Sequence, residues 1–270
     1  MYKTITICCI LIASYSFGQN FDEQWKEVYK LELDGKIQSA QKEVQEIYKK
    51  AKRKKEEVQI IKCFFYVSKF EQVLNEKAQS TIISTLKEEI KEAKPASKAL
   101  LNYIYATLLQ NYYNQNSYKI GKRNDLENQK STDFSTWSTS DYIDEIEKAM
   151  ENSLQNEKSL RATTINDYKE IFEVSPSIDA KNYSLYDFLV EKNMAHYKSK
   201  IKNFDQKNKS DLFQNLYAES TIFVLYNLTL LVDDNLIKLL KILQNNERYY
   251  LSEKKDYKLL PIDLCLPPYK

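Results

Sequence analysis

The chain has very few of the residues that interrupt regular secondary structure. Its 270 residues include only 3 glycines and 5 prolines. These two residues make tight turns and end strands and helices. A fold with many strands needs many such turns, so their scarcity argues against an extensive β structure. The sequence therefore predicts an all-α protein.

Histidine is nearly absent, and this removes several classes of catalytic site. A Ser/His/Asp or Cys/His site would have to use His196, the single histidine, which we interpret as a packing or surface residue of a helix. A zinc-protease motif needs two histidines, and the glycines are too dispersed for a phosphate-binding loop. Adjacent carboxylates (Glu88-Glu89 and Asp233-Asp234) do not face one another on a helix, so they indicate solvated surface. We expect no catalytic, cofactor-binding or metal site.

Cysteine is scarce, and its positions match no metal-site spacing. Outside the first residues the chain has Cys63, within an apolar run, and Cys265, near the C-terminus. We favour a small buried residue at Cys63 and a free thiol at Cys265. A disulfide between them, formed in an oxidising compartment, is the alternative.

Neither sign of charge dominates the chain. It has 40 basic and 38 acidic residues, a formal net charge of +2. The densest basic run, 49–55, is interpreted as a solvated helix end, where cations interact favourably with the helix dipole. Nucleic-acid binding requires a larger basic patch, so we expect no nucleic-acid partner.

The first 18 residues have the features of a secretory signal. Lys3 precedes an apolar stretch of about 12 residues, and the small residues Ser16 and Gly18 follow it. Such a stretch is too short for a membrane span, which needs about 20 residues. We predict cleavage after Gly18, which removes Lys3 and lowers the net charge to +1. The expected protein is exported, periplasmic or associated with the cell envelope, and has no membrane span.

Apolar residues recur at helical spacing in the first part of the chain. A helix over 22–33 is expected to end at Gly35 and to form a hairpin with a second helix over 37–51. A third helix, 56–75, is apolar on nearly all sides, so we expect it in a middle layer. Its polar positions form a narrow stripe: Lys55, Gln59, Lys62, Lys69, Gln72 and Glu76.

Two further helices are predicted before the pattern dissolves. One spans 80–93, and the next spans 95–113 with Pro95 in its first turn. The polar stretch 114–137 is interpreted as a long connector and a sub-boundary of the domain. Loops of this length are often functional, but we favour a plain connector. The residues expected to pack it are Tyr118, Ile120, Phe134 and Trp137.

The rest of the chain is predicted to hold shorter helices. Ser138 with Asp141, and Ser184 with Asp187, have the spacing of capping boxes. The second of these opens a helix to about Lys200. Further helices are expected over 165–172, 211–232 and 234–252, before a tail or interrupted linker over 253–270.

Stacked hairpins of this length resemble tetratricopeptide architecture. The first hairpin has large and small residues near the positions of that repeat: Trp25, Val28, Ala40 and Tyr48. No clean 34-residue repeat follows. The predicted fold is therefore an irregular, TPR-like array of antiparallel helical hairpins over 19–252.

Tyrosine is abundant, with 21 residues. Tyr112-Tyr113 and Tyr249-Tyr250 are the clearest clusters. Tyrosines can stack on sugars or peptides, but in helical hairpins they more often fill interfaces and keep the hydroxyl wet. We favour the second interpretation.

An ordered series of short segments is similar to a known bacterial family. It comprises Trp25, Leu31-Glu32, Gly35, Ser39-Ala40, Glu46–Ala51, Gln59–Lys62, Glu88–Ile90, Leu100-Leu101, Asn111–Asn116, Arg123, Asp133–Trp137 and Ser184–Leu189. In this order the segments resemble the N-terminal helical region of α-2-macroglobulin-like proteins of Bacteroidetes-type bacteria. The similarity extends over about 22–197.

That resemblance implies an exported protein from a family that traps or inhibits proteases at the envelope. The family's β-sandwich domains and bait region are not in this chain. Its Cys-x-Glu-Gln thioester is also missing, since neither Cys63 nor Cys265 is followed by that motif. We therefore expect a non-catalytic helical interaction module, either a truncated or split member or a stand-alone copy. Its expected partner is a protein, either the missing macroglobulin domains or an envelope protein.

Two alternatives belong to other functional classes. The first is a stand-alone TPR-like adaptor in envelope assembly or secretion. The second is an all-α enzyme, such as a glycan-cleaving one, which would need two carboxylates facing each other across a cleft about 5 to 10 Å apart.

Overall fold

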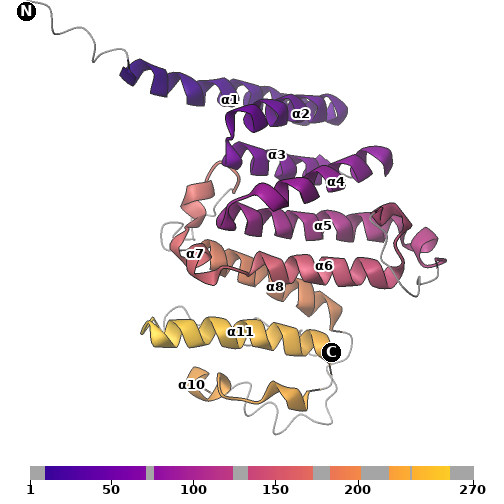
Figure 1. Ribbon diagram of the computed structural model, residues 1–270, viewed down its shortest axis with the longest axis vertical. Helices are drawn as coiled ribbons and strands as arrows, with labels where there is room; N and C mark the ends of the chain where they lie inside the picture. The colour runs from indigo at the N-terminus through magenta and orange to yellow at the C-terminus, as the bar shows by residue number, and fades with distance from the viewer. Residues whose placement is uncertain are drawn as a thin grey trace, which may run out of the picture. The chain divides into compact units, whose positions relative to one another are not determined.

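The chain is all-α and divides into two compact units. The computed structural model (Figure 1) describes residues 10–70, 76–123, 133–172, 183–201, 219–231 and 233–255. These residues contain no strand, and their one β-type pairing is an antiparallel bridge between Thr164 and Ser184. One unit comprises 1–155 and 168–174, and the other comprises 156–167 and 175–270. Both ends of the 114–137 connector belong to the first unit.

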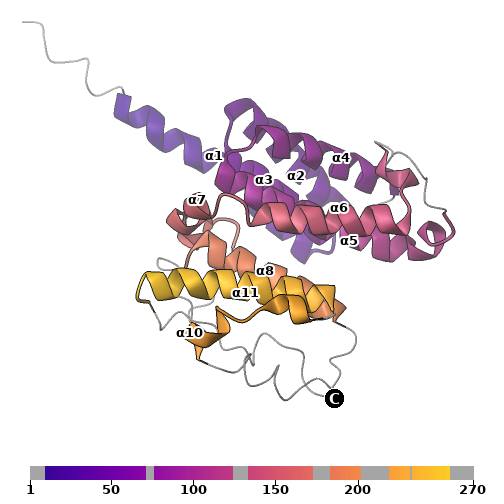
Figure 2. The same cartoon turned by 60° about the horizontal axis from the view of Figure 1, so that its bottom comes forward.

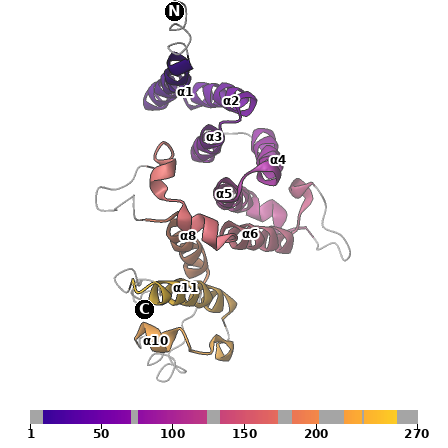
Figure 3. The same cartoon turned by 60° about the vertical axis from the view of Figure 1, so that its left-hand side comes forward.

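The helices of the first unit pack in succession. They are α1 (Ile10–Leu33), α2 (Ile37–Lys54), α3 (Glu57–Phe70), α4 (Glu76–Glu92), α5 (Pro95–Ile120) and α6 (Thr139–Ser153). The pairs α1–α2, α2–α3, α4–α5 and α5–α6 are in contact, and α3 also contacts α5. Figure 3 shows α3 between α2 and α5. The predicted middle-layer position of the third helix is therefore confirmed.

The α1–α2 hairpin forms as predicted at its turn but not at its start. Gly35 has a φ of 72°, a left-handed conformation that glycine adopts without steric cost. The predicted inner face of Phe21, Trp25 and Val28 is buried. The helix begins at Ile10 instead of residue 22, because this stretch contains no proline and only Gly18 disfavours a helix.

The polar stripe predicted on α3 is partly buried. Lys62 is only 6% exposed, and its ammonium lies 4.4 Å from the centre of the Trp25 ring. Gln59 is also buried and accepts a hydrogen bond of 2.7 Å from the Trp25 indole N–H. These contacts explain why polar residues are tolerated there: they face the aromatic side of α1.

The predicted connector is partly helical. Helix α5 continues to Ile120 because residues 114–120 include no strong helix breaker. Tyr118 is 77% exposed, so its predicted packing role is wrong, whereas Ile120, Phe134 and Trp137 are buried as predicted. Phe134 opens the 3₁₀ helix η2 (Phe134–Thr136). Residues 124–132 lie outside the described part.

The capping box that starts α6 is confirmed. The Ser138 hydroxyl accepts from the Asp141 N–H at 3.3 Å, and the Asp141 carboxylate accepts from the Ser138 N–H at 3.0 Å. Each side chain therefore satisfies a backbone donor that has no partner within the helix. The Tyr142 hydroxyl then donates to the Phe134 carbonyl at 2.6 Å and fixes η2 against α6.

The second unit is built around α8 and α11. It contains α7 (Glu157–Ala162), α8 (Leu185–Lys200), α10 (Ser220–Phe223), the 3₁₀ helix η5 (Leu228–Leu230) and α11 (Asp234–Ser252). Helix α8 contacts α7 and α11, and α11 contacts α10 and η5. Figure 2 shows α8 beside α11. The Ser184–Asp187 capping box and the end of α8 at Lys200 are confirmed, and the Asp233 side chain caps the start of α11.

Two predicted helices of this region are wrong. The helix expected over 165–172 is only a short 3₁₀ turn, η3 (Ile165–Tyr168), and α7 precedes it without having been predicted. Of the helix expected over 211–232, the described residues show only α10 and η5. Asn227 interrupts it, because its side-chain oxygen accepts from the Thr229 N–H at 3.0 Å while its own backbone is extended.

Candidate functional site

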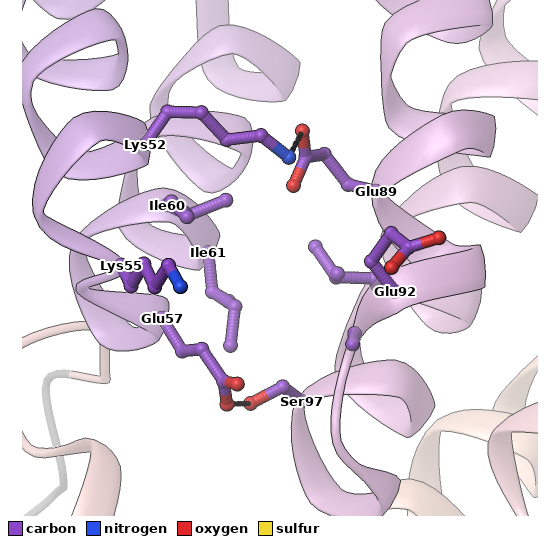
Figure 4. A pocket seen from close by; sticks show the side chains of 10 residues that line it. Lys52, Lys55, Glu57, Ile60, Ile61, Glu89, Glu92 and Ser97 are labelled. Atoms are coloured by element: carbon purple, nitrogen blue, oxygen red, sulfur yellow. Dashed lines mark hydrogen bonds and ion pairs between the residues drawn. The ribbon is translucent and has the colours of Figure 1, made fainter.

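A cavity of about 380 Å³ lies in the first unit, between the α2–α3 turn and the α4–α5 turn. We call it the groove (Figure 4). Among the described residues α3 and α4 make few direct contacts although they are consecutive, and this leaves space between the two turns. Its polar residues are Lys52, Lys55, Glu57, Glu89, Glu92 and Ser97, and Ile60, Ile61 and Leu101 add aliphatic surface.

One charge of the groove, Glu89, is buried and paired with a lysine. Its carboxylate accepts from the Lys52 ammonium and, at 2.8 Å, from the Tyr48 hydroxyl. Burial, together with the bond to Glu89, raises the pKa of Tyr48, so the hydroxyl remains a donor. Glu89 is 7% exposed, which corrects the prediction that Glu88-Glu89 is solvated. Only Glu88 is exposed, and it pairs with Lys91 at 2.8 Å.

A second charge, Glu57, ties the start of α3 to the start of α5. Its Oε2 accepts from the Ser97 hydroxyl at 2.8 Å, and its Oε1 lies 3.3 Å from the Lys94 ammonium. The Ser97 oxygen also lies 3.4 Å from the hydroxyl of Tyr168. The two walls of the groove are therefore held by side-chain bonds from both turns.

Lys55 and Glu92 are the charges of the groove that remain uncompensated. Lys55 follows the last residue of α2, and Glu92 ends α4, so they lie on opposite walls (Figure 4). Both are exposed. Among the described residues neither side chain makes an ion pair or a hydrogen bond. Within the part of the chain that the structure describes, the groove therefore presents one free cation and one free anion above aliphatic surface.

The basic run 49–55 has a further role beyond the one predicted. It forms the C-terminal end of α2, as expected, with Lys52, Arg53 and Lys54 in the last turn. However, Lys52 bonds to Glu89 and Lys55 lines the groove. The sequence pattern identified the helix end correctly but did not show which of its lysines face another helix.

A segment that is not α-helical docks beside the groove. This docked segment, residues 168–172, belongs to the first unit. Glu170 accepts from the Gln59 amide at 2.6 Å, and the Phe172 ring meets the edge of Phe65 at 5.5 Å between ring centres. With the approach of Tyr168 to Ser97, these contacts attach the segment to α3 and α5.

The second unit contains a buried arginine cluster. The Arg161 guanidinium lies between the rings of Tyr186 and Tyr249, at 4.1 and 3.6 Å from their centres. It donates to Glu157 at 2.7 Å and to Asn246 at 3.0 Å. Its side chain is 6% exposed. One side chain therefore connects α7, α8 and α11.

Asp187 extends this cluster at the start of α8. It accepts from the hydroxyl of Tyr250 at 2.5 Å and from the hydroxyl of Ser184 at 2.7 Å, and it lies 3.8 Å from Arg161. Burial and the bond to Asp187 raise the pKa of Tyr250. The Tyr250 hydroxyl is thus buried and bonded, which corrects the prediction that it stays wet. Because its charges are paired, we interpret the cluster as structural.

The remaining sequence candidates are not among the residues that line the groove. His196 is half-buried in α8, where its ring meets Tyr197 edge-on at 5.1 Å. Cys63 is buried in α3 as a free thiol, and burial raises its pKa. Asp233 caps α11 through a bond of 2.9 Å from the Leu236 N–H. Cys265 lies outside the described residues.

Within the described residues, no group of three or more His, Cys, Asp or Glu side chains is placed to hold a metal ion. Of the helices in that part of the chain, none combines the length and apolar character needed to cross a bilayer.

Comparison with known proteins adds no relative. No protein-family model, curated protein or solved structure matches the chain. The resemblance to α-2-macroglobulin-like proteins therefore stays a prediction.

Proposed function

We propose that the protein is a non-catalytic interaction module whose groove binds an extended peptide segment of a partner protein. The observation that carries this proposal is that two charges of opposite sign on the walls of the groove, Lys55 and Glu92, have no partner among the described residues. Lys55 and Glu92 lie on opposite walls beside aliphatic surface, while the neighbouring Lys52, Glu57 and Glu89 are compensated. Such a surface offers a peptide both an apolar contact and two charged contacts.

The docked segment supports the same conclusion. Residues 168–172 are held on α3 and α5 by a carboxylate, an aromatic ring and a hydroxyl. Side chains of the helices that line the groove therefore already hold a segment of this chain that is not α-helical. A partner segment in the groove would use the same kinds of contact.

A catalytic role is the rival for the same cavity. Glu57, Glu89 and Glu92 all line it, and a glycan-cleaving enzyme needs two carboxylates on opposite sides of its substrate. However, two of these carboxylates are engaged by lysines, Glu89 by Lys52 and Glu57 by Lys94. We favour binding because, as far as the described residues show, the charges left free in the groove are one cation and one anion.

The cellular setting of the module is part of the proposal. The leader-like first 18 residues support export to the periplasm or cell envelope, and the ordered sequence segments support a relationship to the N-terminal region of α-2-macroglobulin-like proteins. The partner is then the macroglobulin domains or another envelope protein. A stand-alone TPR-like adaptor is the alternative. Macroglobulin domains encoded directly downstream and binding to the purified chain would favour the first; an envelope assembly complex that binds instead would favour the second.

A peptide selection tests the binding role directly. The full chain is immobilised and used to select from a random library of linear peptides, and Ala93→Trp is used to fill the groove. Selected peptides are expected to bind the unaltered chain and to lose at least tenfold in affinity with Ala93→Trp. The control is Ala96→Trp, since Ala96 is also half-buried but does not line the groove. Circular dichroism confirms that both variants fold. Selection of no peptide, or equal effects of the two substitutions, would contradict the proposal.

A further inference from the structure

We propose that the groove selects dipolar segments, meaning peptides with one acidic and one basic side chain, over segments whose charges have a single sign. This inference rests on the proposed function. The selectivity of the groove would come from the charges on its two walls. Lys55 on one wall and Glu92 on the other face the solvent as free charges of opposite sign.

The other charges of the groove cannot contribute the same selectivity. Lys52 is occupied by Glu89, which also accepts from Tyr48. Glu57 is occupied by Ser97 and Lys94. A ligand cation that paired with either carboxylate would share it with a lysine that is already bound there, whereas pairing with Lys55 or Glu92 displaces only water. The selectivity therefore depends on two residues.

The backbone of Lys55 supports a role for its side chain. Lys55 has a φ of 57°, in the left-handed region that non-glycine residues disfavour. In the turn before α2 the residue with the same left-handed conformation is a glycine, Gly35, with a φ of 72°. Lysine at this helix end therefore carries a steric cost that glycine would avoid. Its ammonium, placed on the wall of the groove, gives a physical reason for retaining it.

Four pools of linear peptides test the inference. Each pool carries two variable positions, at every spacing, on the same uncharged background. The positions are occupied by one aspartate and one lysine, by two aspartates, by two lysines or by two serines. An exposed ion pair strengthens binding a few-fold at most, and a like-charge contact weakens it by a similar factor. The dipolar pool is expected to bind about three- to tenfold more tightly than either single-sign pool at low salt.

Charge reversal supplies the matched controls. With Lys55→Glu both free charges are negative, and the preference should move to the two-lysine pool. With Glu92→Lys both are positive, and the two-aspartate pool should bind best. The double variant restores one charge of each sign and should again prefer the dipolar pool. Reversal of Lys91, exposed on α4 but outside the groove, should leave the order of the pools unchanged.

The outcomes separate this inference from the proposed function. Equal binding of the charged pools, or a preference that the reversals do not move, would overturn the selectivity. If random-library peptides are still blocked by Ala93→Trp, peptide binding in the groove stands without it. If no peptide of any library binds, both proposals fall.

Discussion

The guanidinium of Arg161 stacks 3.6 Å from the centre of the Tyr249 ring, although 88 residues separate them in sequence. The contact joins α7 to α11 and also brings Arg161 within reach of Asp187 on α8. A buried cation of this kind stabilises the unit only while its partners are present, because an uncompensated charge in the interior is costly.

Removing Arg161 is therefore expected to destabilise the second unit. Arg161→Ala leaves Asp187 and Glu157 without their cation and deletes the ring stacking, at a cost of about 3 kcal/mol. Hydrogen exchange of the α8 and α11 amides measures the loss. Lys158→Ala, an exposed change on the same short helix, is the control and should alter the exchange little. Equal exchange in the two variants would show that the cluster does not hold these helices together.

The stability of the second unit is expected to fall as the pH rises. Burial raises the pKa of Glu247 to about 7, from an ordinary value of 4.5, while a hydrogen bond from Ser220 partly opposes the shift. Between about pH 4.5 and 7 the carboxyl group of Glu247 ionises in the unfolded chain but stays protonated in the folded chain. The free energy of unfolding therefore falls as the pH rises through this range. The loss, on the order of 1 to 2 kcal/mol, is complete above that range.

Comparing Glu247→Gln with Glu253→Gln tests this pH dependence. The first should flatten the fall in hydrogen-exchange protection of α11 between pH 5 and pH 8, after correction for intrinsic exchange. The second removes an exposed carboxylate near the end of the same helix and should preserve the fall. Both tryptophans, Trp25 and Trp137, lie in the first unit, so their fluorescence reports separately on that unit. A pH profile unchanged by Glu247→Gln would contradict the assignment.

Local features of this fold were predictable, because they depend on neighbours in sequence. The capping boxes at Ser138 and Ser184 and the turn at Gly35 are read from residues a few positions apart, and all three are present. The short helix η5 was harder to predict, because Asn227 can cap a new turn or continue a helix, and the apolar run around it favoured the second.

The groove could not be predicted, because its interactions link distant positions. Lys52 and Glu89 each look like solvated helix charges in sequence, and only the packing of α2 near α4 brings them together. The docked segment is similar, since nothing near Glu170 indicates that its partner is Gln59. One local signal was available: a lysine, not glycine or asparagine, stands where α2 must end.

Replacing that lysine by glycine should stabilise the protein and impair its proposed function. Lys55→Gly relieves the left-handed conformation and is expected to raise the free energy of unfolding of the first unit by about 1 kcal/mol. Arg53→Gly, exposed within the last turn of α2, should lower it by a similar amount, because glycine disfavours a helix. Urea denaturation followed by tryptophan fluorescence measures both. A Lys55→Gly variant that is less stable than the parent would show that the ammonium stabilises the turn itself.

The buried amide of Gln59 is expected to be essential to the first unit. It accepts from the Trp25 indole at 2.7 Å and donates to Glu170 at 2.6 Å, so it joins α1 to the docked segment through α3. Gln59→Leu keeps the approximate volume but leaves the buried indole N–H without an acceptor, which costs about 1 to 3 kcal/mol. The control Gln45→Leu changes an exposed glutamine of α2. Urea midpoints measure stability, and the indole N–H resonance of Trp25 should shift only in the first variant. Two equal midpoints and an unmoved resonance would show that this hydrogen bond contributes nothing to the fold.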